Sequence, residues 1–217
     1  MHQKLVLRGE KVMIKHHEKV ACTLEILFYL ARNYKTEKIT INMISSNLSQ
    51  MDYLYENFTS NKSILNSIKQ CNDTFPNLIE IKKAKKSCYY SNGSNFYYVS
   101  LNCNVYTKLL NYILNATTNN FGSNLDFKNN NLLLTIQVIK IILDEKYKDG
   151  ISFIDLYNIT KCSYKKINKI IISLENLFSN NILISNEKPN NITYKSYHSC
   201  WITVKNRKSI LEKISII

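Results

Sequence analysis

Apolar residues recur at steps of three and four near the start of the chain. Over residues 19–34 they share one face: Val20, Leu24, Leu27, Phe28, and Leu30 or Ala31. This spacing predicts an amphipathic helix with one buried stripe. The next segment, "KITINMISSNLSQ", opens with a β-branched stretch and then places Ile41, Ile44 and Leu48 at helical spacing. It predicts a brief strand that leads into a second, short helix.

A third helix is predicted in "NKSILNSIKQC", with Asn61 as its N-cap residue. Ile64, Leu65 and Ile68 fall on one face of this helix. The other face is polar: Lys62, Asn66, Lys69 and Gln70.

A hairpin is predicted in "NLIEIKKAKKSCYYSNGSNFYYVSLN". Its first run alternates, breaks at residues 91–94, and resumes as an aromatic, β-branched run. Asn-Gly between two such runs is typical of a tight hairpin, because both residues tolerate positive φ. A helix over 105–115 is expected to close this half of the chain.

The second half repeats this order of elements. "NNNLLLTIQVIKIILDEKYK" predicts a helix with a broad apolar face that ends at Asp149-Gly150. "ISFIDLYNIT" predicts a short extended entry and a short helix, with a turn after it and Ser163 as the N-cap of the next helix. "NILISNEKPNNITYKSYHSCWITVKN" predicts a second hairpin, broken at 189–191, and a closing helix is expected over 207–217.

The two copies of this order are separated by the polar stretch "NATTNNFGSNLDFKNNN". We therefore predict an α+β, mainly helical chain that is divided as follows: an N-terminal extension at 1–17, a first unit at 18–117, a linker at 118–128, and a second unit at 129–217. The repeat is one of element order and not of residue identity. The helix over 132–143 is more apolar all round than one core face requires, which makes it a candidate surface for a homodimer or for contact between the units.

Positive charge dominates the composition. The chain has 29 lysine and arginine residues against 16 aspartate and glutamate residues, a formal net charge of +13 over 217 residues. No acidic segment cancels this charge locally, so nucleic acid is the leading candidate partner. The codon bias of an AT-rich genome is an alternative explanation for part of the lysine and asparagine excess. A hydrophobic content of 45% suffices for a packed core.

The sequence has no run of about 18 apolar residues that would span a bilayer, and its start has no signal-peptide-type apolar core. We expect no membrane contact and a cytoplasmic, nucleoid-associated location. The cysteines are scattered and form no Cys-x-x-Cys pair: Cys22, Cys71, Cys88, Cys103, Cys162 and Cys200. Reduced, mostly buried thiols are expected. A redox sensor is the alternative for Cys71, Cys88 and Cys103, which flank the first predicted hairpin.

A helix-turn-helix before a two-stranded ribbon is predicted twice, in "ISFIDLYNITKCSYKKINKIIISLENLFSNNILIS" and in "ITINMISSNLSQ", "NKSILNSIKQ" and "LIEIKKAKKSCYYSNGSNFYYVSL". In this order the chain resembles the winged-helix superfamily, as two tandem winged-helix (helix-turn-helix plus β-hairpin) domains. "LEILFYLARNY" is similar to the opening helix of winged-helix regulators that sense iron–sulfur clusters, but their glycine-rich wing and compact cysteine set are missing here. The tandem arrangement is similar to plasmid replication initiators, some transcription regulators, and winged-helix partners of chromosome-organising complexes.

The resemblance implies that the third helix of each unit enters the major groove of DNA and that the ribbon tip lies along a neighbouring groove or the backbone. In the second unit the apolar residues form the core side: Ile167, Ile170, Ile171, Leu174 and Leu177. The outward N-terminal turns carry the candidate DNA contacts: Ser163, Tyr164, Lys165, Lys166, Asn168 and Lys169. Lysines there would neutralise phosphates, and Asn168 could read an adenine edge. The alternative is a solvated lysine face on an ordinary bundle helix.

Further candidate DNA contacts come from the first unit and from the ribbons. Either 52–58 or 61–71 is the recognition helix of the first unit, and the second of these supplies Lys62, Asn66 and Lys69. The first ribbon adds a basic and aromatic group: Lys82, Lys83, Lys85, Lys86, Tyr89 and Tyr90. Lys188 and Lys195 form a weaker counterpart in the second ribbon. A charged edge strand that discourages aggregation is the alternative for the first ribbon.

No enzymatic activity and no cofactor are expected. The chain has four glycines and no phosphate-cradling glycine loop, and no carboxylate pair stands at a catalytic spacing. His16-His17 with Cys22, and His198 with Cys200, are two-ligand fragments without zinc-type spacing. The expected function is a sequence-specific double-stranded DNA-binding protein, either a transcription regulator or a replication initiator. The alternative is a protein-interaction subunit of a chromosome-organising or replication complex.

Overall fold

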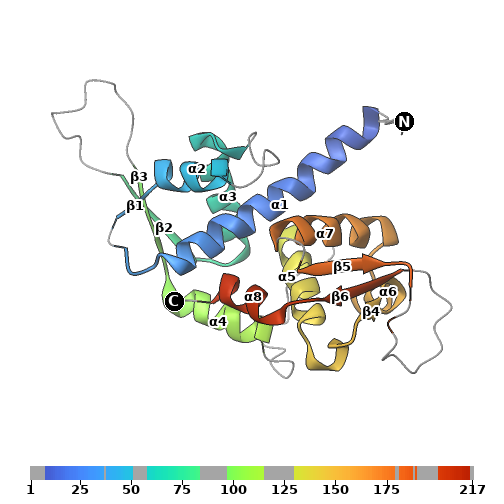
Figure 1. Ribbon diagram of the computed structural model, residues 1–217. Coiled ribbons are helices and arrows are strands. Elements are labelled where there is room, and N and C mark those ends of the chain that lie inside the picture. Colours follow the sequence, from blue (N-terminus) through green and yellow to red (C-terminus); the bar gives the residue numbers. More distant parts are fainter. Residues whose placement is uncertain are drawn as a thin grey trace.

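The computed structural model describes residues 8–36, 38–50, 58–83, 97–114, 130–178, 181–187, 189 and 200–215, and the side chains from residue 18 onwards. Within these residues the chain is α+β and mainly helical, with two small three-stranded sheets (Figure 1). None of its described helices combines the length and the apolar character that crossing a membrane requires.

The first half of the chain contains the elements of the first predicted copy. They are α1 (Arg8–Arg32), β1 (Ile39–Thr40), α2 (Ile41–Gln50), α3 (Asn61–Thr74), β2 (Ile79–Lys83), β3 (Tyr97–Leu101) and α4 (Cys103–Leu114). The short strand β1 joins the hairpin, so the antiparallel sheet has the order β1-β3-β2. Ile41, Ile44 and Leu48 are the buried residues of α2, which confirms the helix predicted from their spacing.

The second half contains the same order of elements. They are α5 (Asn131–Ile142), a 3-10 turn η2 (Glu145–Tyr147), β4 (Ile151–Ser152), α6 (Phe153–Thr160), α7 (Tyr164–Leu177), β5 (Ile182–Ser185), β6 (Trp201–Val204) and α8 (Arg207–Ile214). Their antiparallel sheet has the order β4-β6-β5, which matches the first sheet strand for strand. The predicted repeat of element order is confirmed, and it extends to the pairing of the strands.

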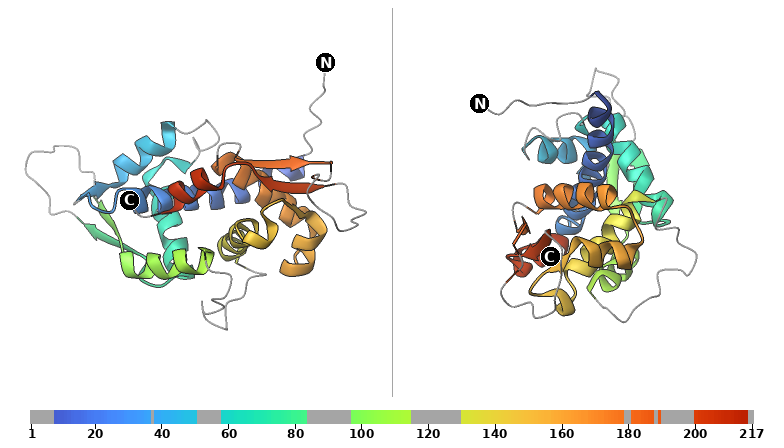
Figure 2. Two further views of the ribbon diagram at one scale, coloured as in Figure 1. Left: turned by 60° about the horizontal axis from the view of Figure 1, so that its bottom comes forward. Right: turned by 90° about the vertical axis from the view of Figure 1, so that its right-hand side faces the viewer.

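The helix α1 differs from the prediction of one buried stripe. It begins at Arg8, inside the stretch 1–17, and ends at Arg32. Every residue from Val20 to Phe28 is buried, because α2, α3, α5, α7 and α8 all pack against this helix. It lies between α3 and α7 and so belongs to the packing of both halves (Figure 2). The single-stripe prediction is wrong for this reason: elements distant in the sequence cover the other sides of the helix.

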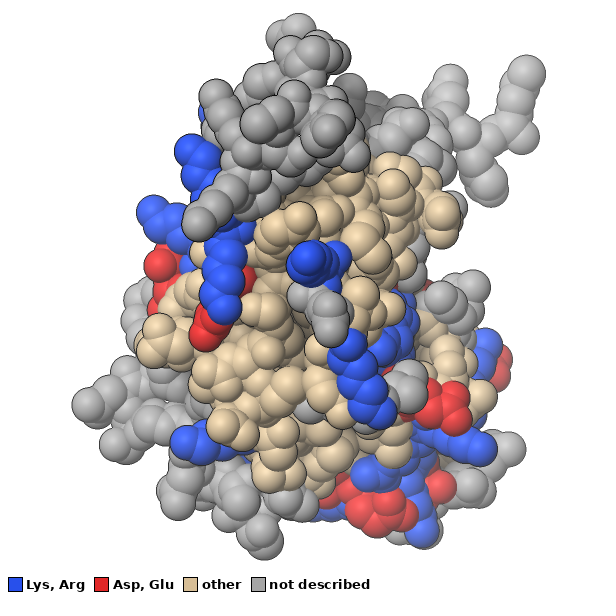
Figure 3. Space-filling model, turned by 90° about the vertical axis from the view of Figure 1, so that its left-hand side faces the viewer, with Lys and Arg blue, Asp and Glu red and all other residues tan. Residues whose placement is uncertain are grey.

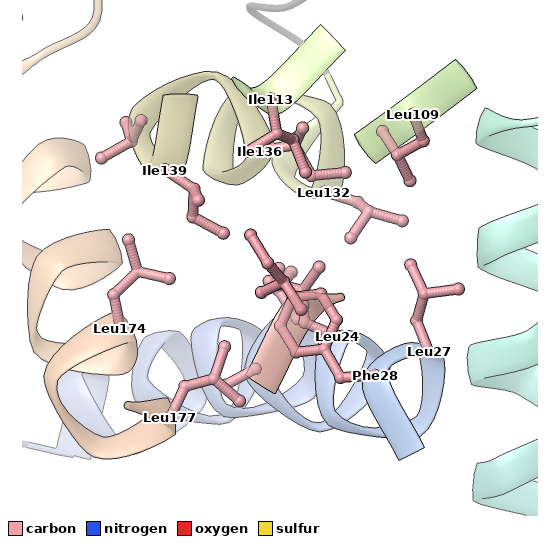
Figure 4. Close-up of a cluster of buried hydrophobic side chains, with 14 of the residues drawn as sticks. Leu24, Leu27, Phe28, Leu109, Ile113, Leu132, Ile136, Ile139, Leu174 and Leu177 are labelled. Atoms are coloured by element: carbon pink, nitrogen blue, oxygen red, sulfur yellow. The ribbon is translucent and has the colours of Figure 1, made fainter. Parts of the chain in front are cut away.

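One apolar core joins the two halves. Side chains from α1, α4, α5 and α7 point toward one another in Figure 4: Leu24, Leu27, Phe28, Leu109, Ile113, Leu132, Ile136, Ile139, Leu174 and Leu177. The rings of Phe28 and Phe178 stack with their centroids 6.2 Å apart. The helix α5 is covered by α1, α4 and α6, so its all-round apolar surface is buried within the chain. This helix therefore gives no reason to expect a homodimer.

Two predicted helix ends are wrong. The N-cap of α3 is Ser60 and not Asn61, because the Ser60 side chain accepts a hydrogen bond from Ser63 N. The helix α5 ends at Ile142 and not at Asp149-Gly150, because Asp144 caps the 3-10 turn that follows. Gly150 then reverses the chain with φ of 129°, a conformation that other residues rarely adopt. The predicted hairpin turn at 91–94 lies outside the described residues, and so does all of 189–191 except Pro189.

Candidate nucleic-acid interface

The helix α7 separates apolar and polar side chains as the sequence predicts. The five predicted core residues are its buried residues, each at most 1% exposed: Ile167, Ile170, Ile171, Leu174 and Leu177. On the outer side, Ser163, Tyr164 and Lys165 are exposed. Lys166, Asn168 and Lys169 are half-buried. The structure therefore brings the six predicted contacts together around the first two turns of one helix.

Local contacts fix the start of α7. Lys161 has φ of 54°, and this left-handed residue ends α6 and turns the chain toward α7. The ring of Tyr164 then packs against Phe153 of α6, with centroids 5.0 Å apart. Partial desolvation, and after it the electrostatic and hydrogen-bond interactions with Cys200, raise the pKa of Tyr164 above its usual value. The N-terminal end of α7 is thus attached to both α6 and the start of β6.

Two lysines on the outer side of α7 have no acidic partner among the described residues. Neither Lys165 nor Lys169 forms an ion pair with any residue that the structure describes. Ile172 continues the outer face and is 44% exposed. An exposed face that combines free lysines, an amide and an apolar side chain is suited to a phosphate backbone and base edges together.

The helix α3 holds the corresponding place in the first half. Lys62, Asn66, Lys69 and Asp73 are exposed and follow one another at helical spacing along its outer face. The three predicted contacts of α3 are therefore brought together, although Asp73 adds an opposite charge. Residues 51–57, which include most of the rival candidate for the recognition helix, lie outside the described residues.

Few of the predicted contacts in the ribbons lie within the described residues. Lys82 and Lys83 are exposed on β2, and Lys82 Nζ lies 3.4 Å from the carboxylate of Glu80. Six predicted contacts lie outside the described residues: Lys85, Lys86, Tyr89, Tyr90, Lys188 and Lys195. Figure 3 shows the end of the molecule near the first sheet, where blue side chains are spread over the face and red ones stand beside them at its margins. The basic side chains visible on this face do not gather into one patch.

A buried ionic cluster behind α7 was not predicted. Glu25 of α1 is fully buried; its Oε1 accepts a hydrogen bond of 2.9 Å from Arg32. Its Oε2 lies 2.8 Å from Lys213 Nζ of α8, as an ion pair without hydrogen-bond alignment. Lys213 also donates to the carbonyl of Leu177 at the end of α7, at 2.6 Å. The sequence shows only one glutamate within the mainly apolar stretch 20–31, and its partner lies far along the chain.

A polar groove beside α3 was also missed. It has a volume of about 490 Å³ and is lined by residues of α1, α3 and the start of α5: Lys19, Val20, Asn66, Lys69, Gln70, Asp73, Thr74, Asn130 and Asn131. Only Asn66 and Lys69 of these were predicted contacts. The sequence carries no signal for the rest, because the groove exists only where three distant segments meet.

Two buried cysteines offer little reactive thiolate. Burial raises the pKa of Cys71 to about 12, and burial together with the charge of Glu25 raises that of Cys22 to about 12. Cys162 is buried, Cys103 and Cys200 are half-buried, and Cys88 lies outside the described residues. Among the described residues, no three of histidine, cysteine, aspartate and glutamate gather as a metal site.

Comparison with known proteins adds no family to this geometry. No protein-family profile, no curated protein and no solved structure matches the chain. The functional interpretation depends on the arrangement of the two halves and on the side chains of α3 and α7.

Proposed function

We propose that this protein binds double-stranded DNA through two winged-helix units and acts as a transcription regulator or a replication initiator. The repeated topology supports the fold assignment. In each half a short strand precedes the second helix and joins the hairpin as its third strand, which is the arrangement of a winged helix. The third helix of each unit is then α3 in the first half and α7 in the second.

The observation that carries the proposal is the division of α7. Its apolar side is buried to completion, whereas Lys165 and Lys169 remain exposed or half-buried without ion pairs among the described residues. The helix is followed directly by the hairpin β5–β6, as a recognition helix is followed by a wing. A merely solvated helix face does not need uncompensated lysines next to a ribbon, so DNA phosphates are the best-fitting partner.

Affinity and sequence choice come from different side chains in this proposal. The lysines neutralise phosphates and make binding depend on salt. Asn168 lies between Lys165 and Lys169 on the outer face and is the side chain suited to adenine, because an amide can donate to N7 and accept from N6 of the same base.

The proposal is tested by titrating the full chain against random-sequence duplex DNA at several salt concentrations. We expect a steep decrease in affinity with salt, and a slope smaller by about 3 for the triple variant Lys165→Ala, Lys166→Ala, Lys169→Ala. The control variant replaces three exposed lysines that lie outside the interface, Lys146, Lys148 and Lys208, and should keep the slope. A wild-type slope near zero would overturn the proposal.

A protein-interaction role is the second candidate, because apolar side chains are exposed on the second unit. Tyr157 and Ile159 of α6 are 47% and 40% exposed, and Tyr164 is 52% exposed. A partner that co-purifies at a stoichiometric amount, from a chain that heparin does not retain, would favour this role over DNA binding. The homodimer allowed by the sequence has no such observation behind it, since α5 is covered within the chain.

A further inference from the structure

We propose that the polar groove between α1, α3 and the start of α5 holds a backbone phosphate of the DNA that α3 contacts, with Lys19 and Lys69 as its anion-binding side chains. The inference rests on the proposed function and deepens it, because it adds a site in the first unit that lies outside any recognition helix or wing. Lys19 of α1 is the new contact.

The groove opens on the same surface as the outer face of α3. Asn66 and Lys69 belong both to this exposed face and to the lining of the groove. Lys19 adds a residue of α1 to this lining, and Asn130 and Asn131 add the start of α5. A DNA strand that follows the outer face of α3 therefore passes the mouth of the groove.

Hydrogen bonds between side chains hold the walls of the groove in place. Asn130 Nδ2 donates to Thr74 Oγ1 at 3.0 Å, which attaches the start of α5 to the end of α3. Thr23 Oγ1 donates to the carbonyl of Lys19 at 2.8 Å and lies 3.5 Å from Gln70 Oε1, which links α1 with α3. The groove is thus formed before any ligand arrives, and little ordering is required on binding.

The chemistry of the lining selects a polar anion. Apart from Val20, the groove is lined by amides, a hydroxyl and charged side chains, so most of the groups that a ligand meets are polar or charged. Neither Lys19 nor Lys69 forms an ion pair with a described residue, and each has an ammonium group available for a phosphate oxygen.

Asp73 allows a test in which two substitutions in the groove should change DNA affinity in opposite directions. Its carboxylate lines the same groove and repels a phosphate there. If the groove holds a phosphate, removal of the lysine charge must weaken binding and removal of the aspartate charge must strengthen it. A structural role of either side chain would not produce this pair of effects.

The experiment measures binding of the full chain to random-sequence duplex DNA over a range of salt concentrations. Lys19→Gln should weaken binding about 3- to 10-fold and lower the salt slope by about 1, whereas Asp73→Asn should strengthen binding about 2- to 5-fold. Lys19→Arg keeps the charge and should keep the slope. The matched controls Lys148→Gln and Glu212→Gln change exposed charges outside the groove and should alter affinity less than about twofold.

The outcomes distinguish a failure of the groove assignment from a failure of the proposed DNA binding. If the α7 lysine variant loses binding while Lys19→Gln and Asp73→Asn behave like their controls, the protein binds DNA and the groove is not a phosphate site. If the wild type does not bind duplex DNA, the proposed function fails and the groove assignment fails with it. Thermal stabilisation by inorganic phosphate at constant ionic strength that is lost in Lys19→Gln, while this variant binds DNA as the wild type does, would assign the groove to a free phosphate ligand instead and overturn the DNA assignment.

Discussion

The helices α3 and α7 occupy the same place in the two halves and have the same length of 14 residues, yet they present different surfaces. When they are aligned on their first residues, both bury the same five positions. In α7 these are Ile167, Ile170, Ile171, Leu174 and Leu177; in α3 they are Ile64, Ser67, Ile68, Cys71 and Thr74. The backbone arrangement is shared, but α3 fills its inner side with smaller and more polar side chains.

The outer sides also differ. Lys62 and Lys165 occupy equivalent positions, but Lys69 of α3 corresponds to the exposed Ile172 of α7. The lysines of α7 gather in its first two turns, whereas those of α3 are spread along the helix, which carries Asp73 in its last turn. A place in the fold therefore does not determine what a helix can bind. Beside α3, residues of α1 and α5 complete a groove. In the second half, the proposed DNA contacts lie on α7 itself.

The largest expected effect concerns the attachment of α7. Glu25→Gln leaves Arg32 and Lys213 without their carboxylate; the Lys213 side chain is only 14% exposed. We expect the free energy of unfolding to decrease by about 3–5 kcal/mol in urea denaturation, because an uncompensated buried charge is costly.

Hydrogen exchange in Glu25→Gln compares how strongly the variant destabilises α7 and α3. The amides of α7 should lose more protection from exchange than those of α3, since Lys213 donates a hydrogen bond to the carbonyl of Leu177 at the end of α7. Glu212→Gln breaks an exposed pair with Lys208 and should change stability by less than about 0.5 kcal/mol. Equal loss of protection in both helices would contradict a specific link to α7.

The next effect concerns base reading. Asn168→Ala should cost about 1–3 kcal/mol on the preferred site and relax selection at one base pair, with the salt slope unchanged. Asn66→Ala should cost less, because Asn66 lines the phosphate groove. Site selection from a random pool, followed by titration of both variants, measures the difference. If Asn66→Ala lost more affinity for the preferred site than Asn168→Ala, α3 would be the helix that contributes more to base recognition.

Helix capping gives a smaller, purely structural contrast. Ser60 caps α3 by accepting from Ser63 N at 3.2 Å, whereas the side chain of Ser163 makes no capping hydrogen bond at α7. Ser60→Ala should therefore lower the free energy of unfolding by about 1 kcal/mol, and Ser163→Ala by much less. Urea denaturation of the two variants side by side checks this. Equal losses would show that Ser163 also caps its helix in solution.

The smallest effect on stability is expected for Ile172→Lys, which gives α7 the lysine that α3 has at the equivalent position. The side chain is 44% exposed, so stability should change by no more than about 0.5 kcal/mol. The salt slope of DNA binding should increase by about 1 if this face of α7 lies against phosphates. An unchanged slope would place Ile172 away from the DNA backbone.

Much of the fold was predictable from local patterns. The spacing of Ile41, Ile44 and Leu48 predicted α2, and the isoleucines and leucines of α7 predicted its buried side, because helical periodicity is a local property. Helix ends were less predictable: Ser60 instead of Asn61, and Ile142 instead of Asp149-Gly150, depend on individual side-chain hydrogen bonds.

The candidate site was predictable only in part, for a physical reason. The six predicted contacts of α7 lie on one helix, so their order in the sequence already places them together. Lys19, Asn130 and Asn131 come from segments far from α3, and no local pattern relates them to it. Glu25 is the one charged residue in the stretch 20–31, and its partner Lys213 of α8 lies far from it in the sequence.

By itself the sequence determined the elements, their repeated order and the excess of positive charge, all of which follow from composition and from spacing along one helix or strand. Only the tertiary structure decided that residues 20–28 of α1 are buried on all sides, that both halves share one core, and that a polar groove lies beside α3. These features depend on contacts between residues far apart in the chain. Such contacts form because apolar faces must be covered and buried charges must be paired, and the partner for each is fixed by the fold and not by the neighbouring sequence.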